Sequence, residues 1–582
     1  MRLKIIRKKE TWSMSGKRVA TSFLAAAMAV GTLSSAAFAE NGTVDPADLN
    51  WEKPEETINI SVYAGEGDQE EFLADENGGK AVMDEWLLEN LNVTFDWQYM
   101  TGDMTERLNL MLADNSYPSV ITNMPDDMAE KFIAQGKAVD LTEYLDDMPN
   151  LTRRMGDYIN MLKDDEGHIY KLSTLWGENP NVAGLDFGVR WDYYLELGEE
   201  KMYETPQEYI EVMKKILANH PTNDAGQTTY AFTSDNQGKS FLNAMLGAYG
   251  FVNGYKLDEE TGEFTHWLNT DEGLEIAKLV NQMYREGLID PDYQSVDYET
   301  YISKLANGQV LGNFGTWWYA WVGGHQTWAV QEGDDYDKNK RFANVSVHGE
   351  GMSMEDTSLL TSNYVGSYRM IITDKATEEE IQGIVKYLNW EASELGTFIM
   401  GFGAPREENV WKIDDDGTWL FDDEIMNVDT KDTTYHTVKN HYACEYWVAI
   451  CGQWLKSDGR SVFDKIDPRV DRVSIYDYWP VNEDGSFADE GINICWGNYT
   501  APAKDTTMYQ TTFNSRDTIA TIKQMVDDTI TSSWAEIINS ASEEDCVAAF
   551  EAARDNCNAM GLEELTDYYE NSYKANVEKY EG

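Results

Sequence analysis

Three tryptophans stand close together in the middle of the chain. Trp317, Trp318 and Trp321 fall within five positions, directly after a Gly-Thr turn. An indole offers a flat apolar face of about 150–250 Å² together with one N–H donor. Such faces suit a flat, neutral ligand such as a sugar ring, although large aromatic side chains also fill protein cores. We expect at least one of the three to touch a ligand, with ordinary core packing as the alternative.

Two helices and a short strand must position these tryptophans. An amphipathic helix has Thr270 or Asp271 as its N-cap and ends before Gly287, a residue that suits a left-handed C-terminal position. A second helix over residues 298–305 carries apolar side chains on one face, and a strand over 309–314 follows it. The strand therefore delivers the tryptophans at its carboxyl end.

The first part of the chain alternates between strand and helix patterns. Three stretches predict strands and two amphipathic stretches between them predict helices, in the order 57–64, 81–90, 93–99, 106–114 and 119–123. This β-α-β-α-β order predicts a mostly parallel sheet with right-handed crossovers. Ligands of such sheets bind beyond the carboxyl ends of the strands. We therefore expect Glu66, Asp68 and Asn123 to offer polar contacts to a ligand.

Composition limits the classes of partner. The chain has 582 residues, of which 42% are hydrophobic and 12% aromatic, so it has enough apolar side chains for more than one lobe. It holds 46 Lys and Arg against 103 Asp and Glu, a formal net charge of −57. Nucleic acids and anionic membranes are bound through Lys and Arg contacts to phosphate. The balance therefore argues against both and favours a neutral or cationic ligand.

The first 39 residues have the pattern of a targeting segment. Seven Lys and Arg residues precede residue 19, a mainly small and apolar stretch covers 19–33, and Ala37-Phe38-Ala39 fits an A-x-A cleavage site. We expect a signal peptide over 1–39, a polar linker over 40–56 and an exported protein. An uncleaved membrane anchor is the alternative, which the short apolar stretch disfavours.

The cysteines all lie in the last quarter of the chain. They are Cys444, Cys451, Cys495, Cys546 and Cys557. An odd number in an exported protein leaves at least one free thiol unless two chains pair. Their spacing matches no zinc ligand set. We expect mostly buried thiols, with one disulfide as an open alternative.

Catalytic and metal-binding motifs were sought, and none emerges. The sequence contains no G-x-S-x-G elbow and no H-E-x-x-H, and Gly238-Lys239-Ser240 lacks the earlier glycine of a phosphate loop. No segment matches a calcium loop. We therefore expect no catalytic residues, no metal and no cofactor. A glycoside hydrolase, which needs two carboxylates about 5–10 Å apart, stays as the enzyme alternative because 103 acids make chance pairs certain.

Several ordered segments resemble the family 1 extracellular solute-binding proteins of bacterial ABC importers. The matching segments are LNLMLADNSYPSVI over 108–121, GKAVDLTEY over 136–144, EGHIYKLST over 166–174, RWDYYLELG over 190–198 and YREGLIDP over 284–291. Departures are small, such as Ser119 where an acid is usual and Tyr193 where the family has tryptophan. Each segment alone is a weak signal, and their shared order makes the joint signal strong.

The resemblance implies an α/β protein with the two-lobed, type II periplasmic-binding-protein-like fold and a hinge between the lobes. It implies that the protein is not an enzyme. It implies an exported monomer that captures a carbohydrate, above all an oligosaccharide, and presents it to membrane permease subunits. Peptide or polyamine cargo and a non-transport glycan-binding surface protein are the alternatives. The location could be extracellular, on the cell surface or periplasmic, since the lipid-tethering cysteine usual in single-membrane bacteria is missing before Cys444.

The same resemblance divides the chain. The expected parts are a first lobe over 57–175, a second lobe over 176–363, a return to the first lobe over 364–428, and an aromatic-rich insert with C-terminal helices over 429–582. Trp176 is then expected at the floor of the cleft. Asp192 is expected to cap the helix that begins directly after Asp192.

Overall fold

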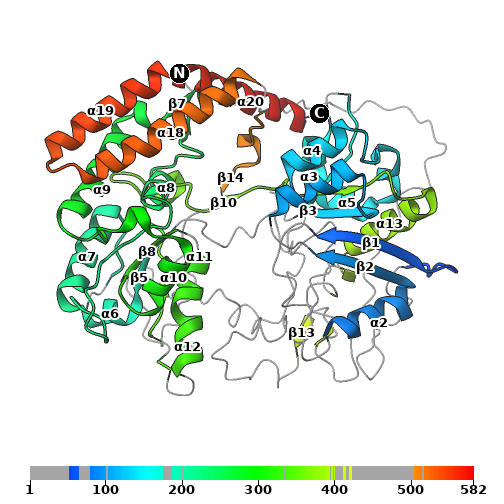
Figure 1. Ribbon diagram of the computed structural model, residues 1–582, viewed down its shortest axis with the longest axis horizontal. Coiled ribbons are helices and arrows are strands. Elements are labelled where there is room, and N and C mark those ends of the chain that lie inside the picture. The colour runs from blue at the N-terminus through cyan, green and yellow to red at the C-terminus, as the bar shows by residue number, and fades with distance from the viewer. Residues whose placement is uncertain are drawn as a thin grey trace, which may run out of the picture.

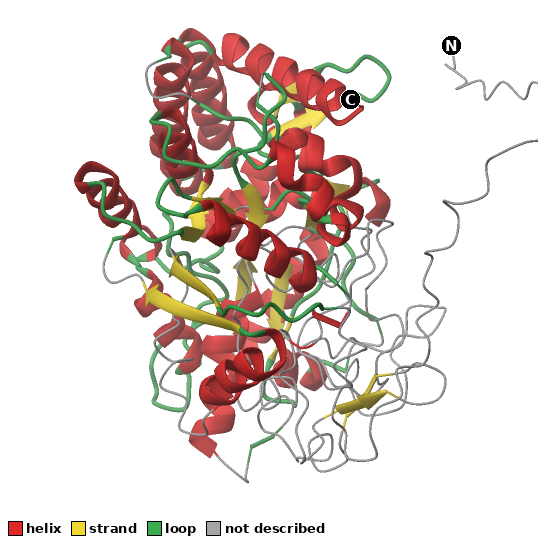
Figure 2. Cartoon of the chain, turned by 90° about the vertical axis from the view of Figure 1, so that its right-hand side faces the viewer, coloured by secondary structure: helices red, strands yellow, loops and turns green. Residues whose placement is uncertain are grey.

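The computed structural model shows two α/β bodies that lie side by side (Figure 1). The first body comprises residues 51–174 and 368–393, and the second comprises residues 186–359 and 517–559. The view turned by 90° shows helices on several sides of the strands, with one short hairpin apart from the helices (Figure 2). The structure describes residues 51–64, 79–99, 103–164, 166–174, 186–198, 201–315, 317–332, 336–337, 339–366, 368–393, 395–396, 399, 411–413, 419–421, 504–513 and 517–581.

A five-stranded sheet forms the centre of the first body, in the order β2-β1-β3-β11-β4. The strands are β1 (Ile58–Ala64), β2 (Val93–Tyr99), β3 (Val120–Pro125), β4 (Leu172–Thr174) and β11 (Tyr368–Ile372). β1 is parallel to both β2 and β3, which confirms the predicted β-α-β-α-β unit. β11 inserts antiparallel between β3 and β4, so the chain returns to the first sheet as predicted.

Helices cover both faces of this sheet because alternate side chains of a strand point to opposite faces. On one face α3 and α4 pack through Leu108, Met128 and Phe132, and on the other α13 packs through Ile384 and Tyr387. The helices and 3-10 turns of the first body are α2 (Gly79–Leu91), α3 (Met104–Asp114), α4 (Asp126–Ala134), η1 (Thr142–Asp147), α5 (Pro149–Met155), η2 (Gly156–Leu162) and α13 (Glu378–Glu391).

The second body is built on a smaller sheet, β8-β5-β9, in which β5 (Asp186–Arg190) is antiparallel to β8 (Gly312–Gly315) and β9 (Phe342–Ala343). A hairpin of β6 (Tyr255–Leu257) and β7 (Phe264–His266) stands beside it. The surrounding helices and turns are α6 (Trp191–Glu196), α7 (Pro206–Asn219), α8 (Lys239–Ala248), η3 (Trp267–Asn269), α9 (Asp271–Arg285), η4 (Tyr293–Ser295), α10 (Tyr298–Ala306), α11 (Trp317–Ala320), η5 (Trp321–Gln326), α12 (Thr327–Glu332) and η7 (Met354–Asp356).

Local sequence signals place both ends of α9 correctly. Thr270 caps α9 by accepting from the amide of Gly273, and Gly287 follows the helix with φ of 74°. The predicted cap at Asp192 is wrong. α6 begins at Trp191 with no side-chain cap, and the Asp192 carboxylate instead accepts from the Arg190 guanidinium at 2.5 and 2.9 Å. The nearby cation outcompetes the helix amides for this acid.

The C-terminal helices α18 (Thr518–Asn539) and α19 (Glu543–Ala559) extend the second body. Asn281 of α9, fully buried, donates to three carbonyls at the end of α18, those of Ile537, Ile538 and Ser540. Cys546 and Cys557 are buried free thiols on α19, and burial raises the pKa of each to about 11. The other three cysteines lie outside the described residues.

Within the described residues, paired strands and the last helix connect the bodies. The linking strands β10 (Thr361–Ser362) and β14 (Lys504–Asp505) pair in parallel, and β14 leads into the turn η8 (Thr507–Tyr509). The last helix, α20 (Leu562–Glu581), packs on the second body through Tyr573, whose ring lies 5.4 Å from that of Phe264. Its far end contacts η2 of the first body through Tyr580.

A separate hairpin is formed by β12 (Trp411–Ile413) and β13 (Trp419–Phe421). None of the described helices is both long and apolar enough for a membrane span.

Candidate functional site

The carboxyl ends of the first sheet expose a set of polar groups that the described chain does not satisfy. Asn123 lies near the end of β3 with φ of 51° and is 9% exposed, and Ser173 and Thr174 lie in β4 and are almost fully buried. The Oδ1 of Asn123 and both hydroxyls have no hydrogen-bond partner within the part of the chain that the structure describes. An unsatisfied buried polar atom costs about 1–3 kcal/mol. Such a cost is expected where a ligand or water completes the hydrogen bonds.

The other predicted site residues lie only partly within the described part of the chain. Trp317 and Trp318 open α11, and Trp321 opens the π-helical turn η5, directly after β8 as predicted. The side chains of these three tryptophans lie outside the described part of the chain, as do Glu66, Asp68 and Trp176 entirely. The expectation that they contact a ligand therefore stays a prediction.

An aromatic and acidic cluster beside these tryptophans was missed by the sequence analysis. Tyr319 of α11 donates from its hydroxyl to Asp235 Oδ2 at 2.7 Å. Its ring lies 5.2 Å from the ring of Tyr298, which is 40% exposed. Burial, the hydrogen bond and the charge of Asp235 all raise the pKa of Tyr319, so its phenol remains a donor at neutral pH. α10 and α11 lie on the side of the second body that is turned toward the first (Figure 1).

This cluster has the chemistry that a sugar ring requires. An exposed tyrosine face offers an apolar plane for the C–H side of the ring. The Asp235 carboxylate accepts hydrogen bonds, and an ionised acceptor forms stronger ones than a neutral group. One feature of the sequence could have pointed to this cluster: the polar run Ser234 to Gln237 follows the apolar residue Phe232. In the structure the backbone of Phe232 forms a parallel bridge with Ile289.

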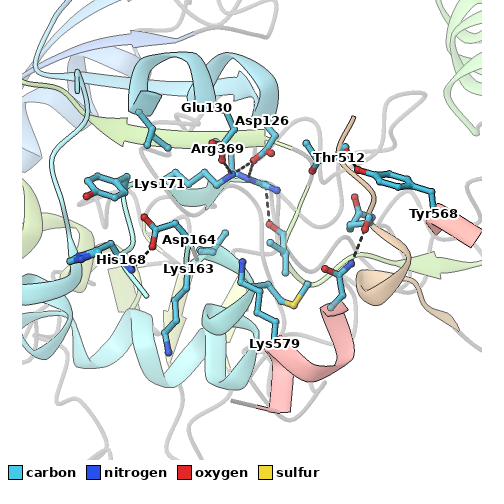
Figure 3. A pocket seen from close by; sticks show the side chains of 17 residues that line it. Asp126, Glu130, Lys163, Asp164, His168, Lys171, Arg369, Thr512, Tyr568 and Lys579 are labelled. Atoms are coloured by element: carbon cyan, nitrogen blue, oxygen red, sulfur yellow. Dashed lines mark hydrogen bonds and ion pairs between the residues drawn. The ribbon is translucent and has the colours of Figure 1, made fainter. Parts of the chain in front are cut away.

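A hollow of about 630 Å³ lies between the first body and α20 (Figure 3). Its upper wall holds a charged network in which Asp126 accepts from Lys171 at 2.7 Å and from Arg369 at 2.6 Å. Burial alone would raise the pKa of Asp126, but Arg369 and Lys171 outweigh it and hold the pKa below its usual value. The lining residues are Asp126, Glu130, Ile133, Met161, Leu162, Lys163, Asp164, His168, Tyr170, Lys171, Val365, Arg369, Gln510, Thr512, Tyr568, Asn576 and Lys579.

Among the described residues, no group of three or more His, Cys, Asp or Glu side chains is placed to hold a metal ion. Asp140 is an example of an acidic side chain that has a structural role instead. Its carboxylate accepts from the Thr142 hydroxyl at 2.5 Å and lies 2.6 Å from His168 Nδ1. Burial would raise the pKa of Asp140, but these hydrogen bonds lower it. The group fixes a turn.

Two α/β bodies joined by paired linking strands, with a late strand returned to the first sheet, form the fold of the ABC-transporter solute-binding proteins. In sequence, the chain is 24% identical over 246 residues to the fructooligosaccharide ABC transporter substrate-binding protein FusA of Streptococcus pneumoniae serotype 4. That match covers 40% of this chain and 45% of FusA, so the aligned part spans less than half of that relative. No family model matches the chain.

Solved structures extend the similarity over most of the chain. FusA in complex with kestose aligns with a TM-score of 0.56 at 16% identity, over 89% of this chain and 99% of FusA. A human-milk-oligosaccharide (HMO) binding solute-binding protein associated with an ABC transporter, from Bifidobacterium longum infantis, aligns with a TM-score of 0.55 at 16% identity, over 89% of this chain and 99% of its own. At these identities the alignments establish the fold, which confirms the predicted fold class.

Proposed function

We propose that the protein is the substrate-binding component of an ABC transporter and captures an oligosaccharide between its two bodies. The fold match over 89% of the chain carries this proposal. Three observations support the sugar class: the name of FusA, the kestose in its solved structure, and the milk-oligosaccharide ligands named for the Bifidobacterium protein. The protein is exported, acts as a monomer and performs no chemistry on the sugar.

The ligand lies between the groups of the two bodies. From the first body, Asn123 and Thr174 provide the hydrogen-bonding atoms that lack partners. From the second body, Tyr298 stacks on a ring and Asp235 accepts from hydroxyls. Trp317, Trp318 and Trp321, which follow β8 in the sequence, are proposed to add stacking faces. From the loops and the crossover between the bodies, Glu66, Asp68 and Trp176 complete the site.

Capture requires a closed arrangement because only that arrangement makes both sets of contacts at once. A ligand that contacts both bodies stabilises the closed state by the difference in its affinity for the two states. The closed form then docks on membrane permease subunits. In this scheme residues 57–175 and 364–428 form one lobe, residues 176–363 form the other, and residues 429–582 complete them.

Calorimetric titration with fructooligosaccharides, milk oligosaccharides, short peptides and polyamines tests the proposal. We expect one oligosaccharide class to bind, and Asp235→Asn and Tyr298→Ala each to weaken it at least about tenfold, which corresponds to about 1.4 kcal/mol. Asp127→Asn is the matched control, since Asp127 is an exposed carboxylate on α4 of the first body. Binding of a peptide or polyamine only, or turnover of a chromogenic glycoside, would reject the proposal.

A further inference from the structure

Another hollow, of about 320 Å³, opens on the second body and shares no lining residue with the cavity of Figure 3. Three segments form it: the loop before α8, the turn η4 and one face of α18. The described lining residues are Gln237, Gln294, Asp528, Thr531, Ser532 and Ala535. A volume of this size lies at the lower end of the range for ligand pockets, so the hollow suits one small group rather than a whole oligosaccharide.

The second body contains three extended segments that run parallel to one another, at residues 230–232, 288–290 and 309–312. The backbone of the first segment bridges in parallel to Ile289 and to Val310. Amides of the first segment also donate to carbonyls of both neighbours. The chain that follows parallel segments leaves the sheet at one edge, and ligands of α/β proteins bind at that edge.

The hollow and the proposed sugar site share this edge. Asp235 and Gln237 follow the first of these segments, two positions apart. Gln294 follows the second segment and comes four positions before Tyr298. Successive Cα atoms lie about 3.8 Å apart, so the backbones of Asp235 and Gln237 are within about 8 Å of each other. A ligand of more than one ring therefore reaches Asp235 and the hollow together.

The loop that carries Gln237 is fixed by contacts within the protein. The Ser234 hydroxyl accepts from the amide of Gly238 at 2.9 Å, and the indole of Trp534 donates to the Gly238 carbonyl at 2.9 Å. Gln237 itself has φ of 62°, a left-handed conformation that side chains of its kind seldom adopt. Strain of this sort is retained where the surrounding structure must hold a side chain at a site. The loop thus presents Gln237 to the hollow in a fixed position.

Four residues of α18 line the hollow at the spacing i, i+3, i+4 and i+7, which places them on one face of the helix. Another face of α18 is apolar and packs in the core of the second body through Trp534, Ile537 and Ile538. On the polar face, the hydroxyls of Thr531 and Ser532 donate to helix carbonyls at 2.7 and 3.0 Å. Each hydroxyl oxygen keeps lone pairs for a ligand donor, so the helix offers acceptors to the hollow.

We propose that this hollow is a second sugar subsite, which binds the ring of an oligosaccharide next to the ring that Asp235 and Tyr298 hold. The subsite rests on the proposed function and adds contacts that depend on the length of the sugar. Gln237 and Gln294 each bring an amide that both donates and accepts, which matches the mixed hydrogen bonding of sugar hydroxyls. The described lining has one acid, Asp528, and no base. An anion therefore finds no counter-charge there, and a polyamine finds only one.

A subsite of this kind makes the protein select sugars by length. A short sugar contacts only Asp235 and Tyr298, whereas a longer one also fills the hollow. The contacts in the hollow are mostly hydrogen bonds between neutral groups, so each contributes a modest factor to the affinity. Because both rings belong to one molecule, the second set of contacts forms without a second loss of translational freedom.

Isothermal titration with sugars of two, three and four rings tests the subsite. The probes are sucrose, kestose and nystose and, in parallel, lactose, lacto-N-triose and lacto-N-tetraose. In Gln237→Gly and in Ser532→Ala we expect about three- to tenfold weaker binding of the four-ring sugar and unchanged binding of the two-ring sugar, because one or two neutral hydrogen bonds are lost. Tyr298→Ala, by contrast, should weaken the binding of every length.

Neither of the two subsite variants should lower the stability of the protein. Glycine adopts the left-handed conformation of residue 237 without strain, and alanine is a better helix former than serine at residue 532. The matched controls are Asn253→Gly, at another left-handed position with φ of 52°, and Ser533→Ala, in the next residue of α18. Neither control position is among the described lining residues. Equal melting temperatures then exclude unfolding as the cause of weaker binding.

A loss of affinity that grows with the number of rings supports the subsite. Equal weakening at every length, or native affinity at every length, overturns the subsite while the sugar-binding function stands. Binding of spermidine that Asp528→Asn abolishes assigns the hollow to a cation and also overturns the subsite. If no sugar of either series binds to the native protein, the proposed function and the subsite are both rejected.

Discussion

Tyr158 of the first body contacts both the linking strands and α20. Its ring lies 4.9 Å from the ring of Tyr364, beyond β10, and 4.9 Å from the ring of Tyr580 in α20. Its hydroxyl donates to Asp505 Oδ2 of β14 at 2.8 Å. Burial and this carboxylate raise the pKa of Tyr158, so the phenol remains a donor at neutral pH. Removal of this side chain should release the end of α20 from the first body.

Two substitutions separate the hydroxyl from the ring. Tyr158→Phe removes one hydrogen bond to a carboxylate that is accessible to water, which is worth about 1 kcal/mol after screening. Tyr158→Ala also removes two aromatic pairs of about 0.5–1.5 kcal/mol each, for an expected loss of about 2–4 kcal/mol. The hydroxyl bond and the Tyr364 pair hold the linking strands, whereas the Tyr580 pair, worth about 0.5–1.5 kcal/mol, holds α20 on the first body. All of these losses leave the core of the second body intact.

Hydrogen exchange measured by mass spectrometry reports this docking, because amides exchange through local opening. We expect exchange over residues 504–509 to be about fivefold faster in Tyr158→Phe, and exchange in the last turns of α20 to be about two- to tenfold faster in Tyr158→Ala alone, since 1.4 kcal/mol is a factor of ten. Tyr249→Phe is the control, because Tyr249 makes the same kind of bond to Glu275 at 2.8 Å within the second body. Native exchange rates in Tyr158→Ala would refute the role of this contact.

Three further predictions concern the second body. Asn281→Leu leaves three carbonyls at the end of α18 without their donor, and calorimetry should show about 2–4 kcal/mol lower stability. Burial lowers the pKa of His266 from 6.5 to about 3, so the folded state stays neutral while the unfolded state gains a proton below pH 6.5. Stability from this group should fall by about 1.4 kcal/mol per pH unit below pH 6.5, and His266→Gln should lack that slope in melts from pH 7 to 5. Gly250→Ala combines φ of 82° with a Cβ only 2.2 Å from the Asp356 carbonyl oxygen, so its melting temperature should drop.

Local chemistry explains why much of the fold could be predicted from the sequence. The α9 cap at Thr270 and the left-handed Gly287 depend on neighbours within a few positions. Alternating apolar side chains predicted β1 and β2, which pair in parallel as expected. The return of the chain to the first lobe, which β11 makes, was expected from the family resemblance. Its place between β3 and β4 is a long-range pairing.

The candidate site could be predicted much less well because its groups meet only after folding. Asp235 and Tyr319 are 84 positions apart, and no local pattern marks either as a partner of the other. The error at Asp192 has a different origin, because its partner Arg190 is only two positions away. The pattern of an acid before a helix suggested a cap, but the guanidinium of Arg190, which stacks on Tyr193 and Trp328, takes the carboxylate. Arg190 is the last residue of β5, and a rule about helix starts takes no account of a cation that precedes the helix.

The contacts of α20 also indicate which of its attachments must yield if the two bodies move. On the second body its attachment is broad, with Tyr573 packed on both Phe264 and Tyr509 and with Tyr569 packed on Tyr255. On the first body the ring of Tyr580 packs on Tyr158, where its backbone carbonyl also accepts from the Asn160 amide at 3.3 Å. The narrower attachment needs less free energy to break, so motion between the bodies should separate α20 from the first body.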